Sequence, residues 1–174
     1  MLVTGAGRRL GRVIALDFAR CGWRVGVHYQ ASAAEASALV AEIDEIGGTA
    51  AALQADLARL DAIFPLIAAC AARLGPPTCL INNAACFDWD SIGTLDQKSW
   101  QSQLDVNLRA PVFLAQAFAQ GLPEGARATS SMSSTRRSCA LIPNSSPILS
   151  PSRRCGPPRE LWPRRSPRAS GSTP

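Results

Sequence analysis

A glycine-rich segment between an apolar run and an amphipathic run constrains this chain more than any other feature. It covers residues 4–11 and reads TGAGRRLG. Glycines let the backbone approach a ligand closely, and the start of the following helix offers unpaired N–H groups and the positive end of a dipole. A strand-to-helix turn of this kind suits a pyrophosphate. An ordinary loop is the alternative interpretation, and the rest of the chain has to decide between them.

Up to residue 120, short apolar runs alternate with longer amphipathic segments, which is typical of βαβ units and a parallel sheet. Proline at position 111 is expected to kink the last helix or to lie near its first turns. The sequence predicts an α/β fold, a Rossmann-type doubly wound parallel sheet. We expect strands at residues 1–4, 24–29, 49–54 and 79–82, and helices at 9–20, 33–46, 57–74 and 96–120.

The composition changes abruptly near residue 127. Residues 1–127 carry a net charge of −2, whereas residues 128–174 carry 8 arginines, 1 acidic residue, 12 serines and 8 prolines. A segment of this composition buries too little apolar surface to offset the entropy of ordering it. We therefore expect residues 1–127 to form the folded domain and residues 128–174 to be a disordered tail. A basic arm for nucleic acid or an anionic membrane is a weaker alternative, because the tail lacks interleaved aromatic residues.

The cysteines show neither CxxC pairing nor the spacing of metal ligands, so we expect free thiols, a reducing cytosol and no metal site. The chain shows no secretory signal pattern and no apolar run of the roughly 18 residues that a membrane span needs. These features predict a soluble, cytoplasmic protein that does not bind membranes or nucleic acid.

Charge around the second strand indicates which anion the turn would accept. NAD-binding sites place an acid at the end of this strand for the ribose hydroxyls, and an acid would repel a 2′-phosphate. This chain offers no acid there. It has donors and cations suited to a phosphate dianion, which favours NADP(H): Arg8 and Arg9 in the turn, and His28, Tyr29, Gln30 and Ser32 after it.

The ordered motifs resemble the short-chain dehydrogenase/reductase (SDR) family, whose signature is T-G-x-x-x-G-x-G. Thr4, Gly5 and Gly11 match it, while Arg9 replaces the middle glycine. The family's other landmarks follow in order, as Asp56-Leu57, Asn82-Asn83-Ala84, and Asn107 inside DVN. Arg9 together with the HY pair at residues 28–29 is similar to the pteridine reductase branch.

The resemblance implies roles for individual residues. The turn, including Leu10, would hold the pyrophosphate, and Asp56 and Leu57 would flank the adenine, although Asp56 also suits the start of a helix. Asn83, Ala84 and Ala85 would line the ribose and nicotinamide side. His28 would contact the cofactor without a catalytic role, a structural histidine being the alternative. Phe87 would stack on a pterin or be a simple loop hydrophobe.

The family's catalytic half has no counterpart in the chain. The resemblance implies a Tyr and a Lys spaced Y-x-x-x-K, but the only tyrosine is Tyr29 and the only lysine is Lys98, and both lie on other elements. Asn107 is the one family catalytic-site residue retained. We therefore expect an NADP(H)-dependent oxidoreductase by family, reducing a pteridine C=N or a carbonyl, that is inactive as written. A non-catalytic NADP(H)-binding module is the alternative.

A shifted reading frame is our hypothesis for the tail. Codons compatible with residues 127–135 can spell G-N-I-V-N-V-V-D in another frame, and those for residues 146–152 can spell S-Y-T-L-S-K, which contains Y-x-x-x-K. In the family the sheet order is 3-2-1-4-5-6-7, so we expect only strands 3-2-1-4 here, with the fourth strand as an exposed edge. Members of the family form homo-oligomers, and we expect this chain to do so less readily.

Overall fold

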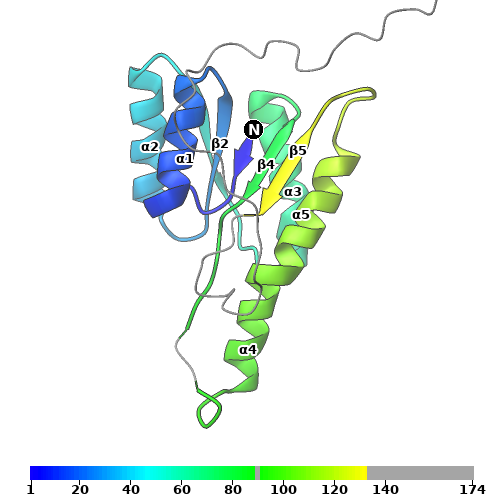
Figure 1. Ribbon diagram of the computed structural model, residues 1–174. Coiled ribbons are helices and arrows are strands. Elements are labelled where there is room, and N and C mark those ends of the chain that lie inside the picture. The colour runs from blue at the N-terminus through cyan, green and yellow to red at the C-terminus, as the bar shows by residue number, and fades with distance from the viewer. Residues whose placement is uncertain (89–90, 133–174) are drawn as a thin grey trace, which may run out of the picture.

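The computed structural model describes residues 1–88 and 91–132, which form an α/β structure with helices on both faces of one sheet (Figure 1). All strand pairs are parallel, and the order is β3-β2-β1-β4-β5. The strands are β1 (Leu2–Val3), β2 (Arg24–Tyr29), β3 (Thr49–Gln54), β4 (Cys79–Asn82) and β5 (Thr129–Met132). The predicted fold class is confirmed.

The helices divide between the two faces. Helices α1 (Arg9–Arg20) and α2 (Ala33–Glu45) cover one face, and α3 (Leu60–Leu74) and α5 (Ala110–Gln120) cover the other (Figure 1). Because successive side chains of a strand point to opposite faces, β1 serves both cores. Leu2 packs in the cluster under α3 and α5, and Val3 packs in the cluster under α1 and α2. Both are fully buried, as the central strand of a parallel sheet requires.

The expected single helix over residues 96–120 contains an interruption. Helix α4 (Gln97–Leu104) continues into a π-helical turn, η1 (Asp105–Arg109), before α5 begins. In that turn the amide of Ala110 donates to the carbonyl of Asp105, five residues back. Pro111 lies in the first turn of α5 and has no N–H to continue the α-helical ladder. The proline therefore sits where one of our two expectations placed it.

Helix α3 begins at Leu60 rather than near residue 57, because Asp56 and the two residues after it form a loop that follows β3. Leu108 in η1 and Val112 in α5 are each 57% exposed, whereas Leu114 is fully buried against the sheet.

The expectation of only four strands is wrong. Thr129–Met132 pairs in parallel with β4, in the register Cys79↔Thr129 to Asn82↔Met132, so β4 is an inner strand and β5 is the edge. Strand β5 forms through its backbone, since all four of its side chains are exposed. The boundary of the expected disordered tail is therefore wrong for residues 129–132. Residues 133–174 lie outside the described part of the chain.

Candidate functional site

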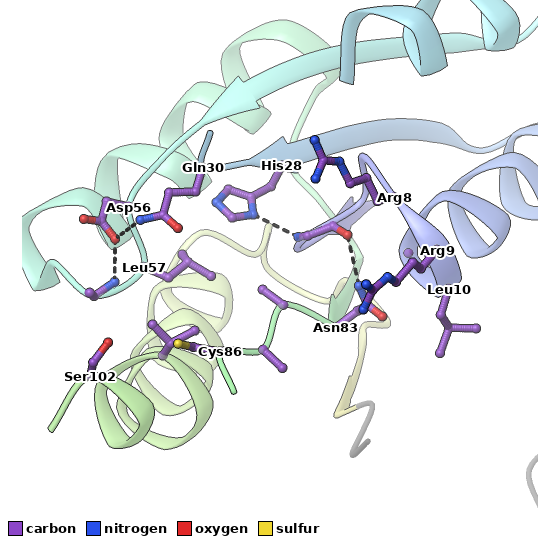
Figure 2. Close-up of a pocket in the computed structure, with 16 residues that line it drawn as sticks. Arg8, Arg9, Leu10, His28, Gln30, Asp56, Leu57, Asn83, Cys86 and Ser102 are labelled. Carbon is purple, nitrogen blue, oxygen red and sulfur yellow. Dashed lines mark hydrogen bonds between the residues drawn. The ribbon is translucent and has the colours of Figure 1, made fainter. Parts of the chain in front are cut away.

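A hollow of about 700 Å³ lies at the carboxyl ends of the strands, where ligands of open α/β sheets bind (Figure 2). Its walls come from the turn after β1, the ends of β2 and β3, the segment after β4, and the face of α4 and η1. The lining residues are Gly5, Arg8, Arg9, Leu10, Gly11, His28, Gln30, Asp56, Leu57, Ala58, Asn83, Ala84, Ala85, Cys86, Ser102 and Val106.

The glycine turn is held tightly against the segment after β4. Gly5 has φ +61°, a left-handed conformation that costs a glycine little, and a Cβ there would lie 3.0 Å from the Cα of Ala84. At Gly11 a Cβ would lie 2.4 Å from the carbonyl oxygen of Gly5 and 2.5 Å from Asn83 Nδ2. Both positions therefore require glycine.

Arg9 occupies the place of the signature's middle glycine and adopts a glycine-like conformation, with φ +50°. Among the described residues it is the one non-glycine residue with positive φ, a conformation that is uncommon for a side chain of this size. Strain of this kind concentrates at ligand-binding segments. The resemblance therefore extends to the backbone even where the residue type departs from it.

Thr4 and Asn83 tie the turn to the segment after β4. Thr4 Oγ1 donates to the carbonyl of Ile81 at 3.3 Å and accepts from the amides of Asn83 and Ala84 at 2.9 and 3.0 Å. Asn83 Nδ2 donates to the carbonyls of Thr4 and Gly5 at 2.9 and 3.1 Å. Thr4 and Asn83 thus fix the turn in place, and of the two only Asn83 lines the hollow.

His28 links the turn to the third strand. It is 2% exposed, and its Nδ1 accepts from the amide of Gly5 at 3.1 Å (Figure 2). Its Nε2 lies 3.1 Å from the carbonyl oxygen of Ala55. These partners define a neutral ring protonated on Nε2. Burial lowers the pKa of His28 to about 4, against which the bond to Ala55 acts only partly. Its structural role is therefore clear, and the residue also borders the hollow.

Asp56 and Gln30 line the part of the hollow that lies at the ends of β2 and β3. Asp56 Oδ1 accepts from Gln30 Nε2 and from the amide of Ala58, both at 3.0 Å (Figure 2). Asp56 therefore organises the loop before α3, as one interpretation predicted, and it also borders the hollow, as the other requires.

The two arginines of the turn differ in their surroundings. Arg8 is paired with Glu35 in the first turn of α2, with its Nε 2.7 Å from Oε1. Hydrogen bonds from the backbone of Glu35 and from Arg8 lower the pKa of the Glu35 carboxyl, which keeps it charged. Arg9 forms no ion pair with any residue in the described ranges. The turn thus presents one partly neutralised guanidinium and one available guanidinium to an anion.

Asn107, the retained family residue, holds the backbone of the segment after β4. Its Oδ1 accepts from the amide of Cys86 at 2.8 Å, and its Nδ2 donates to the carbonyl of Cys86 at 2.7 Å. This pair of bonds fastens the wall of the hollow to η1. Asn107 does not itself line the hollow, so its observed task is to hold Cys86.

Most predicted site residues lie together in the hollow, and five do not. Thr4 and Asn107 act from behind it, as described above, and Tyr29 packs on the core of α1 and α2. The hydroxyl of Ser32 lies beside Gly7, 3.0 Å from where a Cβ would be. Phe87 is 51% exposed on the segment after β4.

Four lining residues were missed: Ala58, Cys86, Ser102 and Val106. Ala58 and Cys86 directly continue predicted segments, at Asp56-Leu57 and Asn83–85, so extending each by one residue would have found them. Ser102 and Val106 are four residues apart on one helix, a spacing that places both on the same face.

Two further findings concern metals and membranes. Within residues 1–88 and 91–132, no cluster of His, Cys, Asp and Glu could hold a metal ion. None of the helices in that same part of the chain is long and apolar enough to cross a membrane.

Known proteins share this arrangement. A family model described as short chain dehydrogenase matches residues 1–136. Among curated proteins, the short chain dehydrogenase/reductase AacuN of Aspergillus aculeatus is 32% identical over 126 residues, 72% of this chain and 48% of that protein. A 3-oxoacyl-[acyl-carrier-protein] reductase of Synechocystis is 38% identical over 113 residues, 65% of this chain and 45% of that protein. The chain thus spans about half the length of these relatives.

A solved structure is similar as well. The alternative dihydrofolate reductase 1, FolM, of Brucella suis, crystallised with NADP, has a TM-score of 0.72 and 36% identity. The match covers 75% of this chain and 54% of that one. With the glycine turn, the NNA segment and the DVN helix placed as the signature requires, the chain belongs to the short-chain dehydrogenase/reductase family.

Proposed function

We propose that the hollow binds NADP(H) and that the chain is the nucleotide-binding half of an NADP(H)-dependent short-chain oxidoreductase. The observation that carries this is the glycine cradle, in which a Cβ at Gly11 would enter the space occupied by the Gly5 carbonyl. Such a cradle lets backbone amides approach a pyrophosphate. The NADP in the FolM crystal structure supports the same cofactor for this chain.

The charges around the hollow favour the phosphorylated dinucleotide. Arg8 and Arg9 border it, and Gln30 rather than an acid stands at the end of β2. A 2′-phosphate would meet guanidinium groups there, and no carboxylate takes the place that binds ribose hydroxyls in NAD sites. By the family resemblance, Asp56 and Leu57 would flank the adenine, and Asn83 to Ala85 would lie along the nicotinamide side.

The proposed reaction is reduction of a pteridine C=N or a carbonyl, for which bound NADPH supplies the hydride. FolM, named a dihydrofolate reductase, supports the pteridine reading. The 3-oxoacyl reductase of Synechocystis supports the carbonyl reading. Phe87 is exposed beside the wall of the hollow, where an aromatic ring could stack on a flat substrate. We propose Phe87 as the residue that distinguishes the two substrates.

We further propose that the chain as written does not turn over, because no Tyr–Lys pair is available to donate the proton. It would then act as a non-catalytic NADP(H)-binding module. A small-molecule ligand, a cytoplasmic location, weakened homo-oligomerisation and the absence of nucleic-acid or membrane partners remain parts of this proposal.

The shifted frame remains our hypothesis for the tail, and β5 supports it. The strand takes the position next to β4, yet its residues are Thr, Ser, Ser and Met, all exposed. The alternative frame would place Ile, Val, Asn and Val at these four positions, a composition suited to a buried parallel strand.

Two experiments test these proposals. Calorimetry on the full chain should show NADPH binding more tightly than NADH, and the double variant Arg8→Ala/Arg9→Ala should abolish that preference. Equal affinities in the native chain would contradict the cofactor assignment.

Sequencing the gene and expressing it with the frame restored should then give NADPH oxidation with a pterin or a carbonyl compound. A gene without an open alternative frame would end the frame hypothesis.

A further inference from the structure

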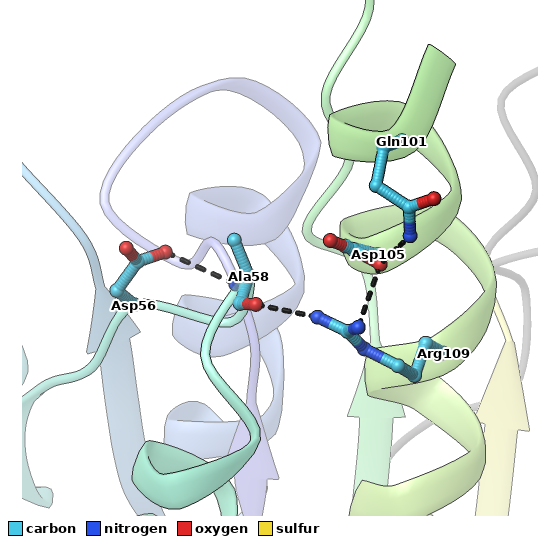
Figure 3. Close-up of polar contacts among 5 residues, drawn as sticks. All are labelled: Asp56, Ala58, Gln101, Asp105 and Arg109. Carbon is cyan, nitrogen blue, oxygen red and sulfur yellow. Dashed lines mark hydrogen bonds and ion pairs between the residues drawn. The ribbon is translucent and has the colours of Figure 1, made fainter. Parts of the chain in front are cut away.

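One side chain of the helical layer reaches across to the adenine side of the hollow. Arg109, the last residue of η1, donates through Nη2 to the carbonyl oxygen of Ala58 at 2.6 Å (Figure 3). Its Nη1 lies 2.9 Å from Asp105 Oδ1, one turn earlier, and that same oxygen accepts from Gln101 Nε2 at 2.7 Å. The guanidinium is thus paired with a residue of its own helix while it donates a hydrogen bond to a separate loop.

The loop that Arg109 contacts, residues 56–58, is part of the wall of the hollow. Ala58 lines it together with Asp56 and Leu57. The amide of Ala58 donates to Asp56 Oδ1 at 3.0 Å, and the same oxygen accepts from Gln30 at the end of β2. Ala58 is therefore held on both sides, through its N–H toward the sheet and through its C=O toward η1.

Arg109 and its partner Asp105 are partly buried. Its side chain is 32% exposed and that of Asp105 is 15% exposed, so water screens the pair less than it screens the other ion pairs of the described residues. Arg109 Nε is buried and has no hydrogen-bond partner within those residues. An unsatisfied buried donor carries a desolvation cost, which the bonds at Nη1 and Nη2 must offset.

The π-helical turn serves both walls of the hollow. Asn107 and Arg109 are two residues apart in this turn, so their side chains leave the helix on different sides. Asn107 holds Cys86 on the segment after β4, while Arg109 holds Ala58 on the segment after β3. One short element therefore sets the positions of two loops that are distant in sequence.

We infer that Arg109 is a positioning residue for the adenine side of the dinucleotide site, acting through the carbonyl of Ala58. This inference rests on the proposed function. With Arg109 in place, the loop at residues 56–58 is ordered before the ligand arrives, so binding does not have to order it. Without it, the Ala58 carbonyl loses its partner on η1, and the loop keeps the hydrogen bonds of Asp56 and the core packing of Leu57.

Adenosine 2′,5′-bisphosphate tests the inference, because it contains only the adenine side of NADP. In calorimetry on the full chain, Arg109→Ala should weaken its binding about tenfold, and Arg109→Lys, which can still donate to Ala58, should recover most of the loss. Asp105→Asn keeps the arginine and removes its charged support, so about a threefold loss is expected. This milder variant covers the case in which Arg109→Ala does not fold.

Arg73 provides the matched control. Its Nη1 donates to the carbonyl of Ala52 in β3 at 2.9 Å, so Arg73 too makes an arginine-to-backbone bond, but it does not line the hollow. Arg73→Ala should leave the affinity within about twofold of the native chain. Equal losses in the two alanine variants, or no loss in Arg109→Ala, would overturn the positioning role alone. A native chain that binds neither the bisphosphate nor NADPH would overturn the proposed function as well.

Discussion

His28 gives this chain a pH dependence that can be assigned to one residue, since it is the only histidine. Burial lowers its pKa from an ordinary value near 6.5 to about 4 in the folded state, while the unfolded chain should keep the ordinary value. The neutral ring accepts from the Gly5 amide, and a protonated ring could not accept that bond.

The direction of the effect follows from the two pKa values. Below pH 6.5 the unfolded state binds a proton that the folded state does not, so the stability contributed by His28 is complete above that pH and falls as pH drops toward about 4. The difference in pKa corresponds to about 3 kcal/mol over the whole range. Losses of this size are a large part of the stability of a domain.

Urea unfolding followed by circular dichroism between about pH 7.5 and about pH 4.5 measures this loss. His28→Asn should be less stable at neutral pH, because it cannot keep both bonds of the ring, and it should lose less stability on acidification. Carboxylates such as Glu35 and Asp61, whose pKa values are lowered, also lose stability in acid, and subtracting the variant's curve removes their contribution. Identical slopes for the native and variant chains, or an imidazole NMR signal titrating near pH 6.5 in the folded chain, would refute the reasoning.

Three other substitutions, two of them with matched control variants, probe the site. Gly11→Ala should destabilise the chain by about 1–3 kcal/mol and weaken NADPH binding, because the added Cβ meets the Gly5 carbonyl. Gly93→Ala, whose added Cβ meets open space, should be neutral in thermal unfolding. A well-folded Gly11→Ala with native affinity would show that the cradle is not tight. Asn107→Ala should cost about 1–3 kcal/mol in urea unfolding by leaving the Cys86 amide and carbonyl unpaired, and a neutral result would remove Asn107 from the wall. Glu35→Gln should raise the preference for NADPH over NADH several-fold by freeing Arg8, while Glu42→Gln, which breaks the Arg12 pair instead, should not; equal shifts in the two variants would point to a general charge effect.

Local patterns were sufficient to predict much of the fold and of the site. Strands β2, β3 and β4 and helix α1 have the bounds that the apolar runs predicted, because each strand is a compact apolar segment bordered by turn residues. The glycine turn, Asp56 and Asn83 come together because parallel strands end at one edge of the sheet.

Other features depend on contacts that no local pattern carries. Strand β5 has no apolar alternation, and it forms because the open edge of β4 offers backbone groups to pair with. The partners of His28 come from two loops, at Gly5 and Ala55, that are distant from it in sequence. The grip of Arg109 on Ala58 joins residues 51 positions apart, which a spacing argument cannot reveal.

Backbone amide NMR with added NADPH tests the central claim most directly. The account predicts that the largest shift changes fall on the amides that border the hollow, namely those of Gly5, Arg9, Ala58 and Ala84. Adenosine 2′,5′-bisphosphate should move the Ala58 signal and leave that of Ala84 nearly unchanged. Changes confined to the separate hollow at the opposite ends of the strands, around Trp23 and Gly47, or no changes at saturating NADPH, would contradict the account.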